Sequence, residues 1–147
     1  MDVKSYLSGY VDGEGCFCVS LNKSFRHAFG WEIRPSFSVS QNNDRKEVLE
    51  IMKDYFNCGS IRPDRSDKTL KFEVRSVQEL TEKVIPHFEK TPLLSGKQKD
   101  FECFSKVCKL VQKKKHLTKE GLNQVLKLAL KMNPSGKRKY SQAEIKI

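Results

Sequence analysis

Hydrophobic and polar positions along the chain follow two periods in turn. Asp2 is a suitable N-cap residue, and apolar residues recur at helical spacing after it. A Gly-Glu-Gly sequence at residues 13–15 ends this pattern. Residues 16–23 and 31–41 then alternate apolar and polar side chains, which is typical of half-buried strands. The loop between them is basic, aromatic and ends in glycine. The pattern therefore predicts a helix followed by a β-hairpin.

The same order occurs a second time. Asp44 and Glu47 have the spacing of a capping box, and they precede a helical apolar stripe that reaches Phe56. Strands are predicted at residues 60–65 and 69–75, with a turn-rich stretch between them. A second helix and a second hairpin are therefore expected.

Two further capping boxes predict two more helices. Ser76 and Glu79 open one helix, in which Pro86 is expected to disturb the regular hydrogen bonding. Ser95 and Gln98 have the same spacing ahead of the next helix. The order up to that point is helix, hairpin, helix, hairpin, helix.

The last part of the chain adds one amphipathic helix, predicted within residues 117–130. From Pro134 the sequence is small, polar and basic. No linker divides the chain, so we expect one domain over residues 1–147, with a core at about 1–115 and a C-terminal helix and basic tail at 116–147. The expected fold class is α+β, an αββαββα core with an antiparallel sheet and extra C-terminal helices.

The net charge of the chain indicates what kind of molecule the protein binds. Lys and Arg number 28 against 18 Asp and Glu, which gives a net charge of +10. Such a surface favours a polyanionic partner, and nucleic acid is the first candidate. The three lysines at residues 113–115 are interpreted either as a solvated helix end or as phosphate contacts.

Two classes of protein are disfavoured. There is no apolar run of about 18 residues and no signal-peptide pattern, so we expect an intracellular protein with no membrane partner, in a bacterial or archaeal cytoplasm or in an organelle. The five cysteines form no C-x-x-C pair, which argues against a zinc site or a disulfide framework.

The most specific stretch is residues 7–15, Leu-Ser-Gly-Tyr-Val-Asp-Gly-Glu-Gly. Gly9 and Gly13 lie four residues apart and share one helix face, where another helix can approach closely. This stretch resembles the motif of the LAGLIDADG homing endonucleases, whose name is the consensus of the nonapeptide. Ser8 replaces the usual alanine and Glu14 replaces the commoner aspartate. The resemblance extends over residues 6 to about 111 and implies the endonuclease fold named above.

The resemblance also implies chemistry. It indicates a Mg²⁺-dependent hydrolase that makes double-strand breaks at specific DNA sites, with Mn²⁺ or Ca²⁺ as possible substitutes in a crystal and no other small-molecule cofactor. Glu14 and the backbone carbonyl of Gly13 would hold the metal. Gln41 would order the attacking water, Lys97 would stabilise transition-state charge or tune that water, and Arg45 would hold phosphate. Each of these last three is alternatively a capping or surface residue.

The motif occurs once, and a glycine-faced helix needs a partner helix. The simplest arrangement is a homodimer in which two motif helices meet on a twofold axis and bring two Glu14 carboxylates together. The target would then be a long, near-palindromic DNA sequence cut across the minor groove. Asp12 is expected to satisfy backbone donors near this contact rather than to bind metal. The predicted interface residues are Leu7, Ser8, Gly9, Tyr10, Asp12 and Gly13.

One face of the predicted sheet is polar and would be left open for double-stranded DNA. Short hydrogen-bonding side chains mixed with arginine suit the reading of base edges in a major groove. Each is alternatively an ordinary solvent-facing residue. The predicted DNA-binding residues are Ser20, Asn22, Arg34, Ser36, Ser38, Ser40, Arg62, Asp64, Lys71, Glu73 and Arg75.

Two other functions remain open at this point. The same fold serves RNA maturases that help an intron to splice, and a DNA-binding regulator could use it without cleavage. A carboxylate facing phosphate argues against the regulator, because a pure binder has no use for it. It does not argue against a maturase.

Overall fold

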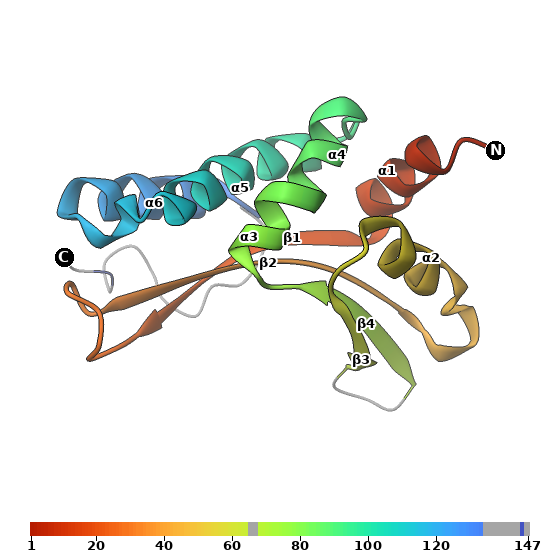
Figure 1. Ribbon diagram of the computed structural model, residues 1–147, viewed down its shortest axis with the longest axis horizontal. Coiled ribbons are helices and arrows are strands. Elements are labelled where there is room, and N and C mark those ends of the chain that lie inside the picture. The colour runs from red at the N-terminus through yellow and green to blue at the C-terminus, as the bar shows by residue number, and fades with distance from the viewer. Residues whose placement is uncertain (65–67, 134–144, 146–147) are drawn as a thin grey trace.

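Four antiparallel strands form one sheet in the order β1-β2-β4-β3, and the helices cover one of its faces (Figure 1). The structure is a computed structural model, and it describes residues 1–64, 68–133 and 145. The basic tail from Pro134 and the predicted turn at residues 66–67 lie outside the described residues. In chain order the elements are α1 (Val3–Glu14), β1 (Gly15–Lys23), β2 (Trp31–Asn42), η1 (Asn43–Arg45), α2 (Glu47–Phe56), β3 (Ser60–Pro63), β4 (Thr69–Val74), α3 (Val77–Glu79), η2 (Leu80–Val84), α4 (Ile85–Lys90), α5 (Lys97–Gln112), η3 (Lys115–Leu117) and α6 (Lys119–Lys131).

The expected α+β fold and the order of helices and hairpins are confirmed. Strand pairing follows the alternation in the sequence, with Phe17 opposite Phe37 and Phe37 opposite Val74. These apolar side chains all point to the helices, because residues directly opposite each other on paired strands lie on the same face of the sheet. The alternate, mostly polar residues of the strands lie on the other face of the sheet. Among the described residues, no helix lies on that face (Figure 1).

The main core is a cluster of phenylalanines between the sheet and the helices. The Phe17 ring lies 5.3 Å from Phe37, 5.4 Å from Phe88 and 5.2 Å from Phe104, measured between centroids. Each of these side chains is fully buried, so each contributes about 1.5–3 kcal/mol of hydrophobic stabilisation. The cluster joins β1 and β2 to α4 and α5 and so holds the helical layer on the sheet.

A second, smaller cluster extends this layer along the first hairpin. Ile33 of β2 packs with Val107 of α5 and with Leu122, Val125 and Leu126 of α6. The predicted C-terminal helix is therefore confirmed as a packed element that lies antiparallel beside α5 over the outer half of β1 and β2 (Figure 1).

Two of the three predicted capping boxes are wrong. Asp44 lies in a 3₁₀ turn, η1, and α2 begins after its N-cap residue Lys46, which makes no capping hydrogen bond with its side chain. Gly96 is the N-cap residue of α5, and the Ser95 hydroxyl donates to the Asp12 carboxylate and accepts the backbone N–H of Lys97 at 3.2 Å, not that of Gln98. The third box is confirmed in part, since the Ser76 hydroxyl accepts a hydrogen bond from the backbone N–H of Glu79.

The disturbance predicted around Pro86 is confirmed. The turn before it, η2, is a π-helix, and Pro86 then stands at the start of α4. Proline lacks a backbone N–H and its ring collides with the preceding turn, so the hydrogen-bond register widens there. This change of register places His87 and Phe88 against the core.

His87 is the centre of a buried polar network that fastens α1 to the rest of the subunit. The hydroxyl of Ser8 donates to the carbonyl of Thr91 at 2.6 Å, so it can only accept from His87 Nε2, which lies 3.0 Å away. This bond requires a proton on Nε2. Burial lowers the pKa of His87 to about 4, so the ring is neutral at pH 7 and its Nδ1 accepts from the Tyr55 hydroxyl, 2.8 Å away.

We therefore expect the subunit to lose stability between pH 7 and pH 5. The unfolded His87 takes up a proton near its ordinary pKa of about 6.5, whereas the folded one stays neutral until about 4, so acidification favours unfolding. The expected loss from this residue is about 2 kcal/mol at pH 5. Urea unfolding at the two pH values measures it. The variant His87→Gln should be less stable at pH 7 and should lose less on acidification; an unchanged pH dependence would contradict the assignment.

Candidate active site and DNA-binding face

Glu14 is the last residue of α1, and its carboxylate is exposed to solvent. Within the part of the chain that the structure describes it has no hydrogen-bond or ion-pair partner, and the last turn of α1 contains no basic residue. A negative charge at the C-terminal end of a helix is unfavourable, because the helix dipole is also negative there. The end of α1 is therefore a place where a bound cation would be stabilised.

Lys97, the first residue of α5, brings a positive charge to this position. Its ammonium group donates to the carbonyls of Val11 at 3.0 Å and Gly15 at 2.6 Å. These carbonyls flank Glu14 at the junction of α1 and β1, so Lys97 ties α5 to that junction. An ammonium group has three donors, and one remains after these two bonds.

Asp12 fixes the segment that leads to Lys97. Its carboxylate accepts backbone N–H groups of Leu94 at 3.1 Å and Ser95 at 3.0 Å, together with the Ser95 hydroxyl. The Ser95 hydroxyl and the two N–H groups hold the pKa of Asp12 below its usual range. The prediction that Asp12 satisfies backbone donors is confirmed, but the donors belong to its own subunit.

Gln41 reaches α1 from the other side. It stands near the end of β2, and its amide nitrogen donates to the hydroxyl of Tyr10 while its carbonyl accepts the Asn42 N–H at 2.9 Å. Gln41 and Lys97 thus both bind groups of α1. Arg45 lies in η1, exposed, and makes no hydrogen bond or ion pair with other described residues, so its assignment to phosphate stays a prediction.

Among the described residues no group of three or more His, Cys, Asp or Glu side chains could hold a metal ion. One subunit offers the Glu14 carboxylate and the backbone carbonyls at the end of α1, of which that of Gly13 was predicted as a ligand. These are hard oxygen donors of the kind that Mg²⁺ and Ca²⁺ prefer, but they are too few for a closed site. The donor set of one subunit therefore fits part of a coordination shell of such an ion and leaves the remaining positions to other ligands.

The open side of α1 is a narrow stripe. The side chains of Val3 and Tyr6 are each 43 % exposed, and a Cβ added at Gly9 or Gly13 would meet no atom within 4 Å. These positions fall within one third of the helix circumference, given 3.6 residues per turn. α1 therefore offers an apolar and aromatic stripe, with two glycines in it, to a partner.

The interface predicted from the motif needs two corrections. Leu7 is fully buried in the core of the subunit, and Ser8 is 3 % exposed and bonded to His87 and Thr91. Both face inwards and are wrong as interface residues, because α1 uses one side for its own core. Tyr6 is exposed on the open side and was missed.

The open face of the sheet carries the side chains predicted for DNA binding. The strand register places Ser20 opposite Arg34 and Ser38 opposite Glu73. The even-numbered residues of β1, β2 and β3 and the odd-numbered residues of β4 therefore lie on this face. Cys16, Cys18, Glu32, Asn42, Ser60 and Thr69 share it by the same rule and were not included in the prediction. Residues of β1, β2 and β4 line a hollow of about 550 Å³ on this face.

The charges on this face are largely paired. Glu73 lies 2.6 Å from Arg62, 2.9 Å from Arg75 and 3.9 Å from Lys71, and Arg34 pairs with Glu32. Glu73 is 7 % exposed and Ser38 is 8 % exposed, so neither is presented as freely as predicted. Glu73 instead holds two arginines in defined positions, which suits bidentate recognition of guanine or phosphate.

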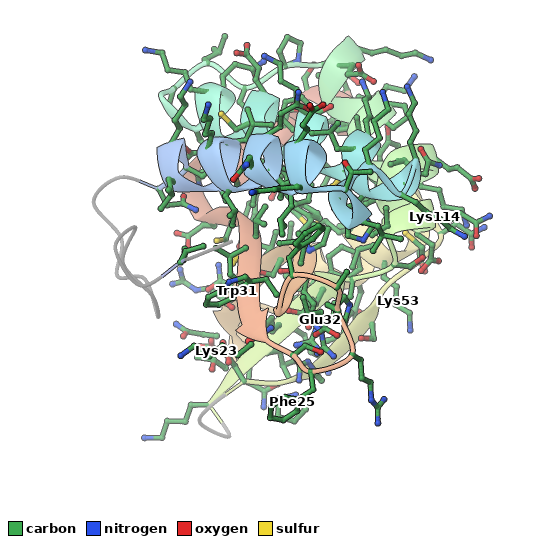
Figure 2. All side chains as sticks on the ribbon, turned by 90° about the vertical axis from the view of Figure 1, so that its left-hand side faces the viewer. Lys23, Phe25, Trp31, Glu32, Lys53 and Lys114 are labelled. Atoms are coloured by element: carbon green, nitrogen blue, oxygen red, sulfur yellow. The ribbon has the colours of Figure 1, made fainter. Side chains whose placement is uncertain are left out.

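The loop of the first hairpin, which is aromatic as its sequence indicated, presents a residue that was not included among the predicted DNA-binding residues. Phe25 is fully exposed at the tip of the loop, and Figure 2 shows it pointing away from the body of the subunit. Hydrogen bonds between the backbones of Ser24 and Gly30 (2.9 Å) and between Gly30 N–H and His27 carbonyl (2.9 Å) close the loop behind it. An aromatic residue among basic residues at the end of the open face extends that face.

Residues 7–108 match the sequence model of the family described as LAGLIDADG endonuclease. The chain belongs to this family. The match begins at the first residue of the motif and ends in α5, so it includes all four strands and the candidate site.

Relatives of this LAGLIDADG chain differ in length. A probable intron-encoded endonuclease 2 of Neurospora crassa is 32 % identical over 130 residues, which are 88 % of this chain and 29 % of that protein. Homing endonuclease I-ApeII of Aeropyrum pernix is 29 % identical over 150 residues, covering 97 % of this chain and 87 % of the relative. The chain spans 24–29 % of the first three curated relatives that it matches.

Solved LAGLIDADG structures have the same fold. The crystal structure of the homing endonuclease I-TnaI matches with a TM-score of 0.83 and 34 % identity, over 88 % of this chain and 87 % of that one. I-SmaMI, bound to an uncleaved DNA target in the presence of calcium ions, matches with a TM-score of 0.87 and 30 % identity, over 95 % of this chain and 46 % of that one. Within the described residues, none of the helices has the length and apolar character needed to cross a lipid bilayer.

Proposed function

We propose that this chain is one half of a site-specific DNA endonuclease, which hydrolyses phosphodiester bonds in both strands of a long, near-palindromic target. The observation that carries the proposal is the position of Glu14. Its carboxylate, which has no partner among the described residues, ends a helix with an open glycine stripe. Lys97 and Gln41 both bond to groups of that helix or of its junction with β1, where the open polar sheet begins. The names and DNA-bound structures of the relatives support it.

The sheet would set the position of the DNA. A curved two-stranded ribbon fits the major groove, where arginine, serine and asparagine side chains distinguish base pairs by their hydrogen-bonding patterns. The arginines that Glu73 holds in place would lose little conformational entropy on binding. Because α1 ends where β1 begins, DNA lying on the sheet passes the Glu14 carboxylate.

The residues around Glu14 would then act on the scissile phosphate. Glu14 and the Gly13 carbonyl would hold Mg²⁺, which supplies charge neutralisation and an activated water when it is bound. The third donor of the Lys97 ammonium group would stabilise charge that develops on the phosphate oxygens. The amide of Gln41 retains one N–H beyond its bond to Tyr10, and this N–H would orient the attacking water.

We propose that a second copy of the chain supplies the other half of the site. Val3, Tyr6, Gly9 and Gly13 form an exposed stripe on α1, and a helix pair related by a twofold axis would cover it in both subunits. Leu94 is 96 % exposed beside the end of α1 and would extend this contact. The I-ApeII and I-TnaI chains are matched over nearly their whole length, which is compatible with a subunit of this size.

The two alternatives lead to different expectations. If the protein were a regulator that only binds DNA, Glu14 would lower its affinity for DNA, because an uncompensated carboxylate repels phosphate. An RNA maturase would retain the fold and would not depend on DNA cleavage. The compartment in which the protein acts stays a prediction.

Incubation of the protein with a randomised duplex library tests the proposal. We expect cleavage in Mg²⁺ that chelation abolishes, at sites whose two half-sequences are approximately inverted copies. Sequencing of the cleaved ends reads the target and the offset of the two cuts together. Duplex binding without cleavage in Mg²⁺ or Mn²⁺ would contradict the endonuclease, and cleaved sites without any twofold symmetry would contradict the homodimer.

A further inference from the structure

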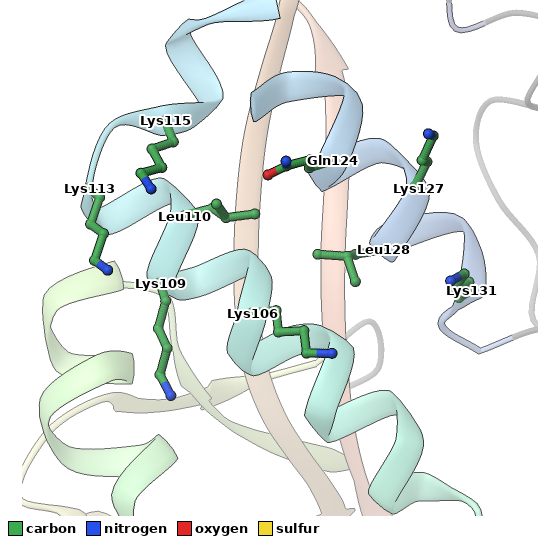
Figure 3. Close-up of a pocket in the computed structure, with 9 residues that line it drawn as sticks. All are labelled: Lys106, Lys109, Leu110, Lys113, Lys115, Gln124, Lys127, Leu128 and Lys131. Carbon is green, nitrogen blue, oxygen red and sulfur yellow. The ribbon is translucent and has the colours of Figure 1, made fainter. Parts of the chain in front are cut away.

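A groove lined by lysines lies between α5 and α6. Its volume is about 480 Å³, and its apolar floor contains Leu110 and Leu128. Figure 3 shows the lysine side chains along both helices at its rims, with the strands of the first hairpin behind them. The lining residues are Lys106, Lys109, Leu110, Lys113, Lys115, Gln124, Lys127, Leu128 and Lys131.

The groove has strong positive charge, most of it without an acidic partner among the described residues. Residues 97–131 contain ten lysines and three acidic residues. Of the lysines that line the groove, Lys109 has an ion pair, with Glu89 at 3.2 Å, and the others have none within the described part of the chain. The open sheet face differs, because acidic partners pair with its arginines. Much of the net positive charge of the protein thus lies away from the proposed reading face.

The groove and the open sheet face point in different directions. Phe104 and Val107 of α5 are fully buried in the two core clusters, on the helical side of the sheet. The rims of the groove belong to the outer surface of that helical layer, and the polar sheet face lies on the opposite side (Figure 1). A duplex on the sheet therefore does not reach the lysines of the groove with the same segment.

The chemistry of the groove fits the backbone of a duplex. Lysine binds phosphate as a point charge without reading sequence, and two parallel rows of lysines would contact phosphates while sugars lie over the leucines. Among the described residues the lining contains no aromatic side chain on which unpaired bases would stack, and none to anchor a membrane interface. Within the same residues, Gln124 is its only neutral polar side chain.

We propose that the groove between α5 and α6 binds a second segment of double-stranded DNA, independently of sequence. One subunit would then hold two DNA segments on opposite sides of the helical layer. Such a protein can pass from one segment to another without first dissociating, which shortens the search for a rare target. The groove does not use Glu14, so this proposal stands or fails separately from cleavage.

The double variant Lys106→Gln, Lys127→Gln tests the groove. We expect its affinity for a non-target duplex to fall about tenfold at physiological salt, and the slope of log K against log salt to become shallower by about 1.8, for two lost phosphate contacts. The matched control is Lys53→Gln, Lys90→Gln, which removes the same charge from exposed positions outside the groove. Equal losses in the two double variants would overturn the proposal.

A bridging experiment identifies the occupant. Protein is loaded on an immobilised duplex, and capture of a labelled non-target duplex is measured with an unlabelled duplex DNA or a duplex RNA of equal length as competitor. We expect capture by the wild type and by Glu14→Gln, capture reduced in the groove variant, and competition by DNA. Absence of capture, or displacement by the RNA but not by the DNA at equal concentration, would overturn the assignment to duplex DNA.

Discussion

The variant Glu14→Gln is expected to lose cleavage of the target by about 10³-fold or more while its affinity for that target changes by less than about tenfold. The substitution keeps the size and shape of the side chain but removes the charge that would hold a metal ion. It leaves the polar face of the sheet untouched, because Glu14 has no contact with that face among the described residues. Single-turnover cleavage in excess protein, together with binding in Ca²⁺, measures the two effects separately.

The matched control is Glu50→Gln, in which an exposed glutamate of another helix, α2, loses the same charge. It should cleave like the wild type. Normal cleavage by Glu14→Gln would contradict the active-site assignment. Loss of binding in parallel with cleavage would instead indicate that Glu14 acts in docking the DNA.

The variant Gly9→Leu is expected to weaken the proposed dimer by about 100-fold or more, because two added side chains would separate the paired α1 helices. The subunit itself has room for the change, since no atom lies within 4 Å of a Cβ at Gly9. Replacing glycine inside a helix also favours the helical state by about 0.5–1 kcal/mol. The fold and the dimer should therefore respond in opposite directions. Sedimentation over a concentration series measures association, and urea unfolding measures the subunit.

Two comparisons make this result interpretable. Glu50→Leu adds an exposed leucine to α2 and should leave the association unchanged. Gly15→Ala should damage the subunit itself, because its Cβ would lie 2.6 Å from the Val11 side chain and 2.9 Å from the Val11 carbonyl. A wild-type protein that is monomeric both alone and on DNA would rule out the dimer, and a Gly9→Leu dimer of wild-type strength would move the interface to another face.

The alternation of apolar and polar residues was sufficient to predict the strands of the sheet and which side chains lie on each of its faces. Once residues 16–23 and 31–41 are strands, their two-residue period assigns every side chain to one of two faces, and antiparallel pairing carries this assignment to the next strand. Ser20, Arg34 and Lys71 therefore lie on the open face as predicted. The alternation did not show that Glu73 would be enclosed by three cations, because that depends on the side chains of its neighbours.

Local helix signals were less reliable. Ser76 caps its helix as predicted, but Ser95 has the same spacing and is recruited by Asp12, which is 83 residues away in the sequence. The Ser95 hydroxyl donates to the Asp12 carboxylate and accepts the backbone N–H of Lys97 at 3.2 Å, not that of Gln98. Asp12 also accepts the backbone N–H groups of Leu94 and Ser95, so a residue of another helix fixes the start of α5. This arrangement depends on a tertiary neighbour.

The sequence by itself determined the order of the helices and hairpins, the polar face of the sheet and the motif that contains Glu14, because each of these is a local or periodic property. The tertiary structure decided the rest. It turned Leu7 and Ser8 inwards to the core and to His87 and left the glycine stripe of α1 open. It also placed Lys97 on α1 and assembled the lysine groove from two helices. These contacts join residues far apart in the chain, so they follow from the packing of whole elements and have no signature in any short stretch of sequence.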